Sequence, residues 1–319
     1  MKKVIKLLAL IKSHNQSKDY LIIKNGTLKT SSGSVSISLK VPINLDCNPN
    51  ASQFIKAMSK CDETPIFTLT KSGKMQIKSG GFKANIDCVD TDNDDTNYPT
   101  GEFNIVDGTD LMNALKTLKP FVSTERIEGR IWTNGIFLDT NSFFATNNTI
   151  LIERWTGFNL TKTCVLPLPA VNILLKNELA PEKLQIDETT ITFHYENVGW
   201  IKCSLYSSPW PVGISKFLDE KGNQTKIIED VFSAIEKINP STDNFGRVYF
   251  NNGFVSTHPE SHESGVSCDV EGLVANCVFN GSMFNLVKGI ASTIDLSIYP
   301  KPSPFSGDNV RGVISGVTE

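Results

Sequence analysis

The chain has 319 residues, of which 39% are hydrophobic and 20% are charged, and its formal net charge is −3. This length allows two or three domains with cores of their own, and the composition excludes a disordered or membrane-embedded chain. The net charge excludes nucleic-acid binding through overall charge alone. Any such binding therefore requires basic residues gathered on one surface.

The first twelve residues, MKKVIKLLALIK, have the basic start of a signal peptide. Their apolar run is short, is interrupted by Lys6 and lacks a small-residue cleavage site, so we expect a helix rather than a signal. Seven scattered cysteines without a Cys-x-x-Cys pair indicate neither a disulfide framework nor a zinc site. We therefore expect a reducing, cytoplasmic location and no metal.

Six segments share one pattern, in which positions i, i+1, i+3, i+4 and i+7 are apolar. Such spacing places the apolar side chains on one stripe of an α-helix. The pattern starts at residues 4, 54, 111, 170, 231 and 283; the fourth copy departs from it at Asn177, and the last extends to Ile290. Intervals of 50 to 61 residues predict a supersecondary unit that occurs six times, here numbered repeats one to six.

Between the predicted helices, apolar and polar residues alternate. Examples are Val35, Ile37, Leu39 and Val41, and the segment KLQIDETTITFHY at residues 183–195. This alternation is typical of half-buried antiparallel strands. Each repeat therefore predicts one helix followed by strands, and the fold class is α+β.

The repeats also form pairs. Asn-Gly, which favours tight hairpin turns, occurs 21 to 23 residues after the helix start in each odd repeat, at residues 25–26, 134–135 and 252–253, and at this place in no even repeat. Aromatic-Pro pairs, at residues 98–99 and 210–211, close repeats two and four. We expect three domains of two repeats each, at residues 1–101, 102–214 and 215–319, with a linker at about 213–226. The acidic run at residues 90–95 is expected to be a solvated loop.

The helix positions i+2, i+5 and i+6 point away from the apolar stripe. Their charged residues are seven lysines and one glutamate, Glu236. Lysine favours helices, but glutamate does so equally, so a merely solvated face, which stays open as the alternative, accounts less well for the bias. We expect these helices to face duplex DNA, which carries a phosphate charge about every 1.7 Å, without reading its sequence. With neighbouring lysines, the predicted set is Lys2, Lys3, Lys6, Lys12, Lys56, Lys60, Lys116, Lys119, Lys176, Lys237 and Lys288.

Paired helix-and-strand repeats with helix lysines resemble the bacterial DNA polymerase III beta sliding clamp family. Three segments also resemble it individually. FTLTKSGKMQIKSGGFKANI, residues 67–86, is similar to the end of the first domain, and RIWTNGIFLDTNSFFATNNTILIE, residues 130–153, to the middle domain. Residues 247–290, which begin RVYFNNGF and end FNLVKGI, are similar to the third domain.

The resemblance implies a ring of two subunits joined head to tail, with helices around a central hole and a continuous outer sheet. Duplex DNA passes through the hole. Such a clamp is a processivity factor and not an enzyme. It needs no cofactor, and its partners are DNA, a second copy of itself, DNA polymerase and a clamp loader. Little sequence precedes the first helix, so a shortened member, such as one from a phage or another mobile element, is expected.

The family also has a pocket that binds short apolar peptides of client proteins. Here Asn-Asn-Thr-Ile, residues 147–150, replaces the family's Asp-Gly-His-Arg, and Ser-Gly-Val-Thr, residues 315–318, replaces Met-Pro-Met-Arg. A cleft for another client motif and ordinary domain packing both stay open. Carried over by position, the pocket residues are Thr133, Thr146, Asn148, Thr149, Ile150, Leu151, Pro211, Val313 and Ser315.

No catalytic set stands out in the sequence. The four histidines are dispersed, HPESHE at residues 258–263 is not a His-Glu-x-x-His motif, and there is no P-loop. Cys203 has no evident base beside it, so we expect a buried strand cysteine. The alternative to a clamp is a structural protein, such as a virion component, that does not encircle DNA. An enzyme would require an acid–base pair in a cleft.

Overall fold

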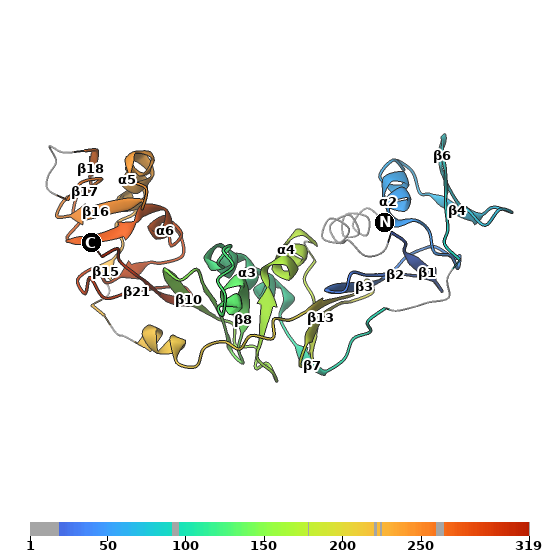
Figure 1. The fold of residues 1–319 in the computed structure, drawn as a ribbon, viewed down its shortest axis with the longest axis horizontal. Coiled ribbons are helices and arrows are strands. Elements are labelled where there is room, and N and C mark those ends of the chain that lie inside the picture. Colours follow the sequence, from blue (N-terminus) through green and yellow to red (C-terminus); the bar gives the residue numbers. More distant parts are fainter. Residues whose placement is uncertain are drawn as a thin grey trace. The chain divides into compact units, whose positions relative to one another are not determined.

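The computed structural model (Figure 1) describes residues 19–90, 96–177, 179–219, 222–223, 225–259 and 265–318. The first predicted helix, with Lys2, Lys3, Lys6 and Lys12, lies outside these residues, as does most of the acidic run at 90–95. The chain forms two compact units. The N-terminal unit contains Met1–Met112, Phe158–Lys162 and Leu166–Ser207, and the C-terminal unit contains Asn113–Gly157, Thr163–Val165 and Ser208–Glu319.

The N-terminal unit contains a seven-stranded and a three-stranded sheet, whose neighbouring strands are antiparallel. Helices α2 (Ala51–Met58) and α4 (Leu168–Asn177) belong to this unit, and α3 (Gly108–Leu118) begins in it. The larger sheet has the order β1 (Ile22–Lys24), β2 (Thr27–Ser31), β3 (Val35–Lys40), β14 (Gly199–Ser204), β13 (Thr190–Tyr195), β12 (Lys183–Ile186), β7 (Glu102–Ile105). The smaller has the order β4 (Ile66–Leu69), β5 (Met75–Ser79), β6 (Phe82–Ile86).

The C-terminal unit contains most of an eight-stranded sheet and a four-stranded sheet. The first has the order β11 (Cys164–Pro167), β8 (Gly135–Leu138), β9 (Ser142–Thr146), β10 (Ile150–Trp155), β22 (Val310–Ile314), β21 (Ser303–Gly307), β20 (Thr293–Ile294), β15 (Thr225–Lys226). The second has the order β18 (Ser267–Asp269), β17 (Phe254–Ser256), β16 (Arg247–Asn251), β19 (Cys277–Asn280). The helical elements are α5 (Asp230–Ile238), α6 (Gly281–Asn285) and the 3-10 turns η1 (Lys119–Phe121), η2 (Ile131–Asn134), η3 (Ile214–Asp219) and η4 (Asn239–Ser241).

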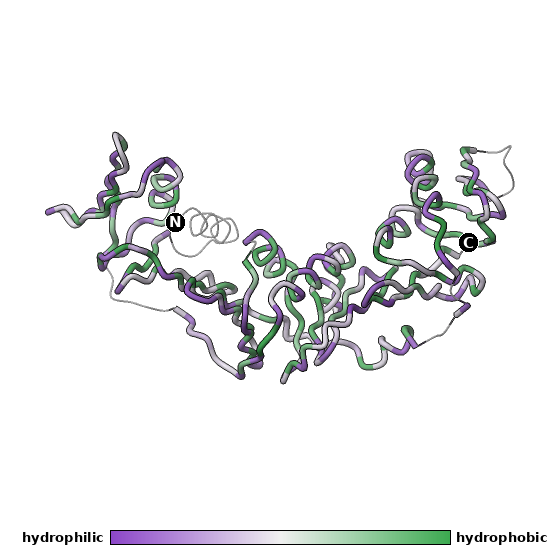
Figure 2. The backbone as a smooth tube through the Cα atoms, turned by 180° about the vertical axis from the view of Figure 1, so that it is seen from behind, coloured by the Kyte–Doolittle hydropathy of each residue, from purple (hydrophilic) through white to green (hydrophobic). Residues whose placement is uncertain are grey.

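Most of the predicted helical stripes are confirmed. All five stripe positions of α5 are buried, from Val231 to Ile238. In α4, Asn177 is also buried although it is polar, so the fourth copy keeps the geometry of the pattern. Figure 2 shows green apolar and purple polar segments alternating along helices and strands, as half-buried elements require. Residues 183–195 form β12 and β13, as predicted.

The predicted sixth helix is too long. It ends at Asn285 rather than at Ile290. Beyond it the N–H groups of Leu286 and Val287 donate to carbonyls three residues earlier, and Gly289 has a φ of +70°. Bonds of this kind tighten the chain into turns, and a left-handed glycine cannot continue an α-helix. Phe284 and Val287 are nevertheless buried, as the stripe predicts.

The Asn-Gly pairs have different structures. Asn25 (φ +50°) and Gly26 (φ +67°) form the predicted tight turn between β1 and β2, and Gly253 (φ +88°) lies in the turn between β16 and β17. The turn predicted at Asn134 is wrong. This residue ends η2, and its buried amide donates to the carbonyls of Ser123 and Glu125, both at 2.7 Å. These two hydrogen bonds give Asn134 a structural role that does not require a turn.

The expected linker at residues 213–226 is more structured than its polar composition suggests. It contains η3 and β15, and Leu218 of η3 is only 7% exposed. The expected boundary between residues 101 and 102 is likewise crossed by a sheet, since β3 pairs with β14. None of the helices that the structure describes has both the length and the apolar character needed to cross a bilayer.

The segment before β7 is fixed to the seven-stranded sheet by a buried lysine. Lys202 of β14 is 3% exposed, and its Nζ donates to Asn97 Oδ1 (2.9 Å), Tyr98 O (2.6 Å) and Thr100 Oγ1 (3.1 Å). Burial lowers the pKa of this ammonium. Thr100 also donates to Asp187. Burial would raise the pKa of the Asp187 carboxyl, but hydrogen bonds from threonine side chains and backbone outweigh it and hold the pKa below its ordinary range.

Candidate nucleic-acid interface and peptide site

The lysines predicted to face DNA are exposed wherever the structure describes them. Each lies on or next to a helix whose apolar stripe is buried, so its ammonium is available to a ligand. Lys288 differs from the others because its Nζ lies 2.7 Å from Glu236, the one acid on these faces. Its charge is therefore partly compensated. The described members are Lys56 on α2, Lys60 after it, Lys116 on α3, Lys119 in η1, Lys176 on α4, Lys237 on α5 and Lys288 after α6.

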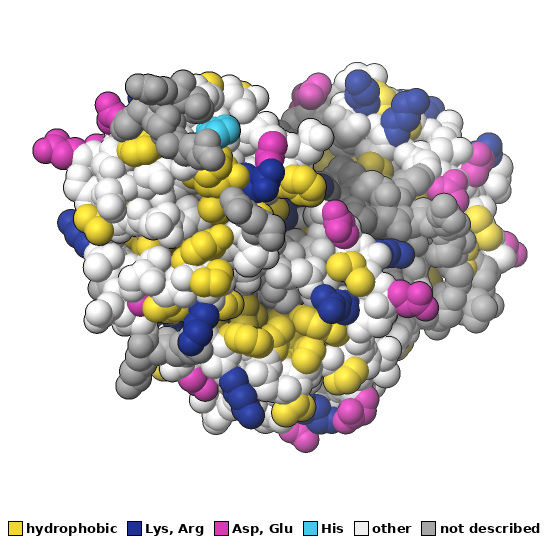
Figure 3. Space-filling model, turned by 60° about the vertical axis from the view of Figure 1, so that its left-hand side comes forward, with side chains coloured by type: hydrophobic (Ala, Val, Ile, Leu, Met, Phe, Trp, Pro, Cys, Tyr) yellow, Lys and Arg dark blue, Asp and Glu magenta, His cyan; other side chains and the backbone are white. Residues whose placement is uncertain are grey.

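Charges elsewhere are mixed. On the face that Figure 3 draws, lysine and arginine side chains are scattered among aspartate and glutamate side chains. Described ion pairs join Lys74 to Asp87 at 2.7 Å and Lys162 to Glu188 at 2.6 Å. Exposed pairs of this kind contribute little to stability. The helix faces, with several lysines and one glutamate, therefore differ from the mixed surface in the sign of their charge.

The strands of the C-terminal unit bring the carried-over pocket residues together. Leu151 of β10 lies directly opposite Thr146 of β9 on one side and Val313 of β22 on the other. These three side chains form a row across the sheet. Ser315 continues β22 and donates its N–H to the carbonyl of Thr149 at 2.9 Å. Residues more than 160 positions apart are thus neighbours.

Four buried residues form a cluster at this place, which we call the Leu151 cluster: Phe144, Leu151, Leu218 and Val313. Phe137, Trp210 and Ile214 pack against it. The rings of Phe137 and Trp210 stack with centroids 5.1 Å apart and planes 4° apart. Pro211 therefore lies next to the cluster through its neighbour Trp210. Leu218 was not predicted from the sequence, where its signal is an apolar pair, Ile214 and Leu218, four residues apart in a polar segment.

An arginine holds η3 against the sheet. Arg311 of β22 forms ion pairs with Glu153 and, at 3.5 Å, with Asp219, and its guanidinium donates to the carbonyl of Leu218 at 3.3 Å. Planar guanidinium groups suit such divided contacts because their donors are fixed in direction. These contacts of Arg311 hold Leu218 in the cluster with Leu151.

Other predicted pocket residues have structural roles. Thr133 and Ile150 are fully buried, so their side chains are closed to a peptide. Asn147 Oδ1 accepts hydrogen bonds from the N–H groups of Thr149 (3.1 Å) and Ile150 (2.8 Å), which forms an Asx turn. Asn148, exposed with a φ of +71°, lies at the tip of this turn. The asparagine here therefore preserves the turn that an aspartate would form.

Neither a protein-family model nor a curated protein matches the sequence. Solved structures do match the fold. The DNA polymerase III subunit beta of Pseudomonas aeruginosa has a TM-score of 0.79 at 14% identity, over 100% of this chain and 98% of that chain. The beta subunit of Streptococcus pyogenes has 0.79 at 17%, over 99% and 98%, and the sliding clamp of Bacillus subtilis 0.78 at 15%, over 100% and 97%. The fold is that of a bacterial DNA sliding clamp.

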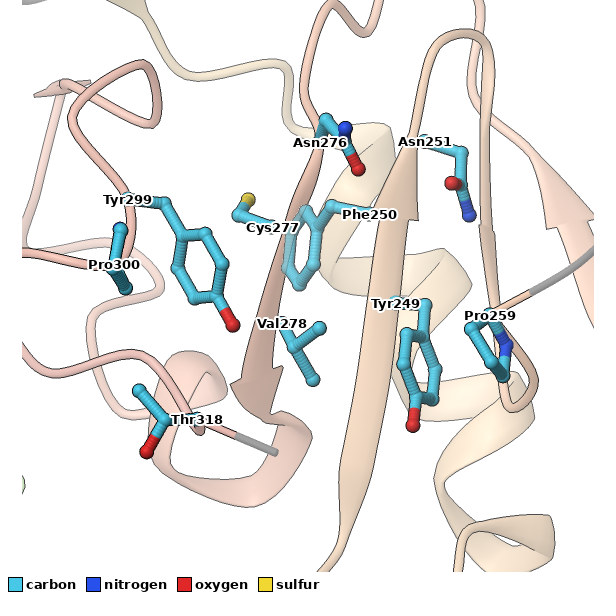
Figure 4. Close-up of a pocket in the computed structure, with 10 residues that line it drawn as sticks. All are labelled: Tyr249, Phe250, Asn251, Pro259, Asn276, Cys277, Val278, Tyr299, Pro300 and Thr318. Atoms are coloured by element: carbon cyan, nitrogen blue, oxygen red, sulfur yellow. The ribbon is translucent and has the colours of Figure 1, made fainter.

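The clamp fold expected from the sequence is thereby confirmed, with its α+β class. A cavity of about 410 Å³ lies in the C-terminal unit between β16, β19 and the segment around Tyr299 (Figure 4). Its described lining has no carboxylate, imidazole or ammonium group and so offers no acid–base pair. Burial raises the pKa of Cys277 in its wall to about 12, and also that of Cys203, so neither thiol is a nucleophile at neutral pH.

Among the described residues, no three or more His, Cys, Asp or Glu side chains lie together in a group that could hold a metal ion. His258 and Pro259 of HPESHE are described, and the rest of that motif lies outside the described ranges. Two candidate sites follow from the geometry: the exposed helix lysines and the Leu151 cluster, whose four residues are 6–7% exposed.

Proposed function

We propose that this protein is a DNA sliding clamp, a processivity factor that closes into a ring around duplex DNA and tethers a replicative polymerase. The observation that carries the proposal is the pairing of repeats in the sheets. Strands of repeat one join those of repeat four through β3 and β14, and strands of repeat three join those of repeat six through β10 and β22. Each odd repeat thus joins the repeat three places later.

Repeat five has no partner three places later among the six repeats of these 319 residues. By the same rule it joins repeat two of another copy. The four-stranded sheet of repeat five and the three-stranded sheet of repeat two would then form a sheet of seven strands, like the seven-stranded sheet within the chain. A head-to-tail contact of this kind closes into a ring. Two copies are expected, with domains at residues 1–101, 102–214 and 215–319.

The edge strands support this pairing. β6 packs against α2, and β18 packs against α5, so joining these two edges places both helices on one side of the sheet. Edge β6 has exposed Lys83 and half-exposed Phe82, and edge β18 has exposed Asp269. Opposite charges and apolar contact favour association, and pairing removes edges that invite aggregation.

The clamp acts without catalysis or cofactor, in the cytoplasm of a bacterium or of a phage's host. The helix lysines bind DNA phosphates regardless of sequence, so the ring slides. A clamp loader opens it, and polymerase and other clients bind at the Leu151 cluster through short apolar peptides.

The deciding experiment compares circular and linear duplex DNA of equal length after loading by a clamp loader. A closed ring should remain on circles and leave linear molecules by running off their ends, and cutting the circle should release it. Equal loss from both forms would show that the protein is not topologically linked and would favour a structural role. The mass in solution, about twice the 35.1 kDa of the chain, checks the subunit number.

A client peptide with apolar anchors should bind at the Leu151 cluster with a roughly micromolar Kd, about −8 kcal/mol. Leu151→Ala and Pro211→Ala should each weaken binding, because they remove apolar surface at or beside the cluster. Calorimetry with a client polymerase peptide measures the Kd. Val274→Ala, an 83% exposed valine outside the cluster, is the control. If Leu151→Ala and Pro211→Ala bind as well as the parent, the peptide site lies elsewhere.

A further inference from the structure

The seven-stranded sheet has one apolar and one polar face. Ile37, Phe193 and Ile201 point to the apolar face and are fully buried. The residues that alternate with them belong to the polar face. Directly opposed residues form a row across all seven strands of this face: Ile22, Lys29, Ser38, Trp200, His194, Lys183 and Ile105.

The polar face is basic. Its strand residues include five lysines and no acidic residue, although the whole chain has more acids than bases. Lys24, Lys40 and Lys183 are exposed, Lys29 is half-buried and Lys202 is the buried lysine described above. The first three form no ion pair with the residues that the structure describes. The ammonium groups of these three lysines are therefore open to solvent, whereas the middle of the face is covered, since Ser36, Ser38, Thr192 and Lys202 are at most 8% exposed.

The same face carries aromatic rings. Phe103 of β7 is 60% exposed, and its ring centroid lies 5.4 Å from that of His194. Tyr98 is 51% exposed, and its ring lies 6.4 Å from Trp200. Trp200 and His194 are directly opposed on neighbouring strands, which lie about 4.8 Å apart. Two pairs of rings thus lie side by side between Lys29 and Lys183.

We infer that the polar face of the seven-stranded sheet binds single-stranded nucleic acid. Lysines along such a face attract the phosphate backbone, and exposed rings stack on bases irrespective of sequence. Sheet faces with exposed aromatic residues are a common platform for single strands. A duplex keeps its bases stacked inside, so it can use the lysines of this face but not its rings. The apolar rings therefore distinguish a single strand from a duplex.

The helix lysines do not belong to this face. Lys176, for example, lies on α4, whereas the face consists of strand residues of the same compact unit. Burial and the nearby Lys183 lower the pKa of His194, which favours the neutral ring at neutral pH. A neutral imidazole beside Phe103 adds stacking surface. A clamp on duplex DNA with this second surface could hold the unpaired strand near a replication fork.

The test measures fluorescence anisotropy of labelled oligothymidine, about 16 nucleotides long, against a duplex of equal length at low salt. The full chain should bind the single strand more tightly. The double substitution Phe103→Ala, Lys183→Glu should weaken that binding about tenfold or more, since it removes an exposed ring and reverses a charge. Lys71→Glu is the matched control: this exposed lysine lies outside both the helices and the seven-stranded sheet, and the change should leave oligothymidine binding unchanged.

Equal affinity for the two DNAs, or an unchanged affinity in the double variant, would overturn the inference. So would equal losses in the double variant and in Lys71→Glu. Binding of oligothymidine to this face does not require the protein to form a ring. A protein that binds oligothymidine through Phe103 but leaves circular duplex DNA would contradict the clamp and not this platform, and the reverse result would contradict only the platform.

Discussion

Changing Lys56, Lys116, Lys176 and Lys237 together to glutamate should abolish the association of the protein with circular duplex DNA. All four lysines are exposed on helices whose other face is buried. Each phosphate contact contributes a slope of about 0.9 to the dependence of log K on log salt, so losing four should cost several orders of magnitude in affinity at low salt. The new carboxylates would also repel the phosphates. The amount of protein recovered on circular DNA after the loading reaction, with and without the substitutions, measures this association.

A matched control changes four other exposed lysines, Lys71, Lys216, Lys226 and Lys301, to glutamate. This variant has the same net charge but unaltered helices. It should keep most of its association with circular duplex DNA. Urea unfolding should show that both variants are folded. If both variants lost DNA association equally, net charge alone would explain the effect. No loss in the helix variant would mean that the helices do not face DNA.

Lys202→Met should destabilise the protein by about 2 to 4 kcal/mol. Methionine fills similar space but cannot donate, so the side-chain and backbone oxygens of residues 97–100 lose their shared donor. Three oxygens then lie against an apolar group, and the segment before β7 loses its attachment to the sheet. The free energy of unfolding in urea measures the loss, and Trp200 fluorescence reports the local change.

Lys183→Met is the control for this substitution. Lys183 is an exposed lysine on the same face of the same sheet, and such surface changes usually alter stability by less than about 0.5 kcal/mol. Equal stabilities of the two variants would show that the segment is held by its remaining contacts, such as the ammonium of Lys29 over the Tyr98 ring at 4.8 Å.

Local features were largely predictable from the sequence. The apolar stripe of α5 and the alternation in β12 and β13 depend on neighbouring residues, so their patterns are visible in the chain. The end of α6 was missed because its residues keep a helical stripe while Gly289 turns the chain. The pair at Asn134 was misread because a buried amide that bonds two carbonyls looks, in sequence, like a turn residue.

Long-range features needed the structure. No local pattern places Lys202 against Asn97, which is 105 residues away, or Leu218 against Leu151. The row of lysines and rings across seven strands likewise depends on register between distant repeats. The resemblance named Leu151 and Val313, which lie directly opposite each other in the sheet, and it omitted Leu218 because the segment that contains it looked like a polar linker.

The opposition of Leu151 and Val313 also has a consequence for synthesis. Val313 belongs to β22, the last strand that the structure describes, whereas Leu151 is made about 160 residues earlier. A nascent polypeptide that has not reached β22 has no partner for this edge of β10 and cannot form the Leu151 cluster. This edge therefore stays unpaired until the ribosome has passed β22, and during that time it can pair with other chains.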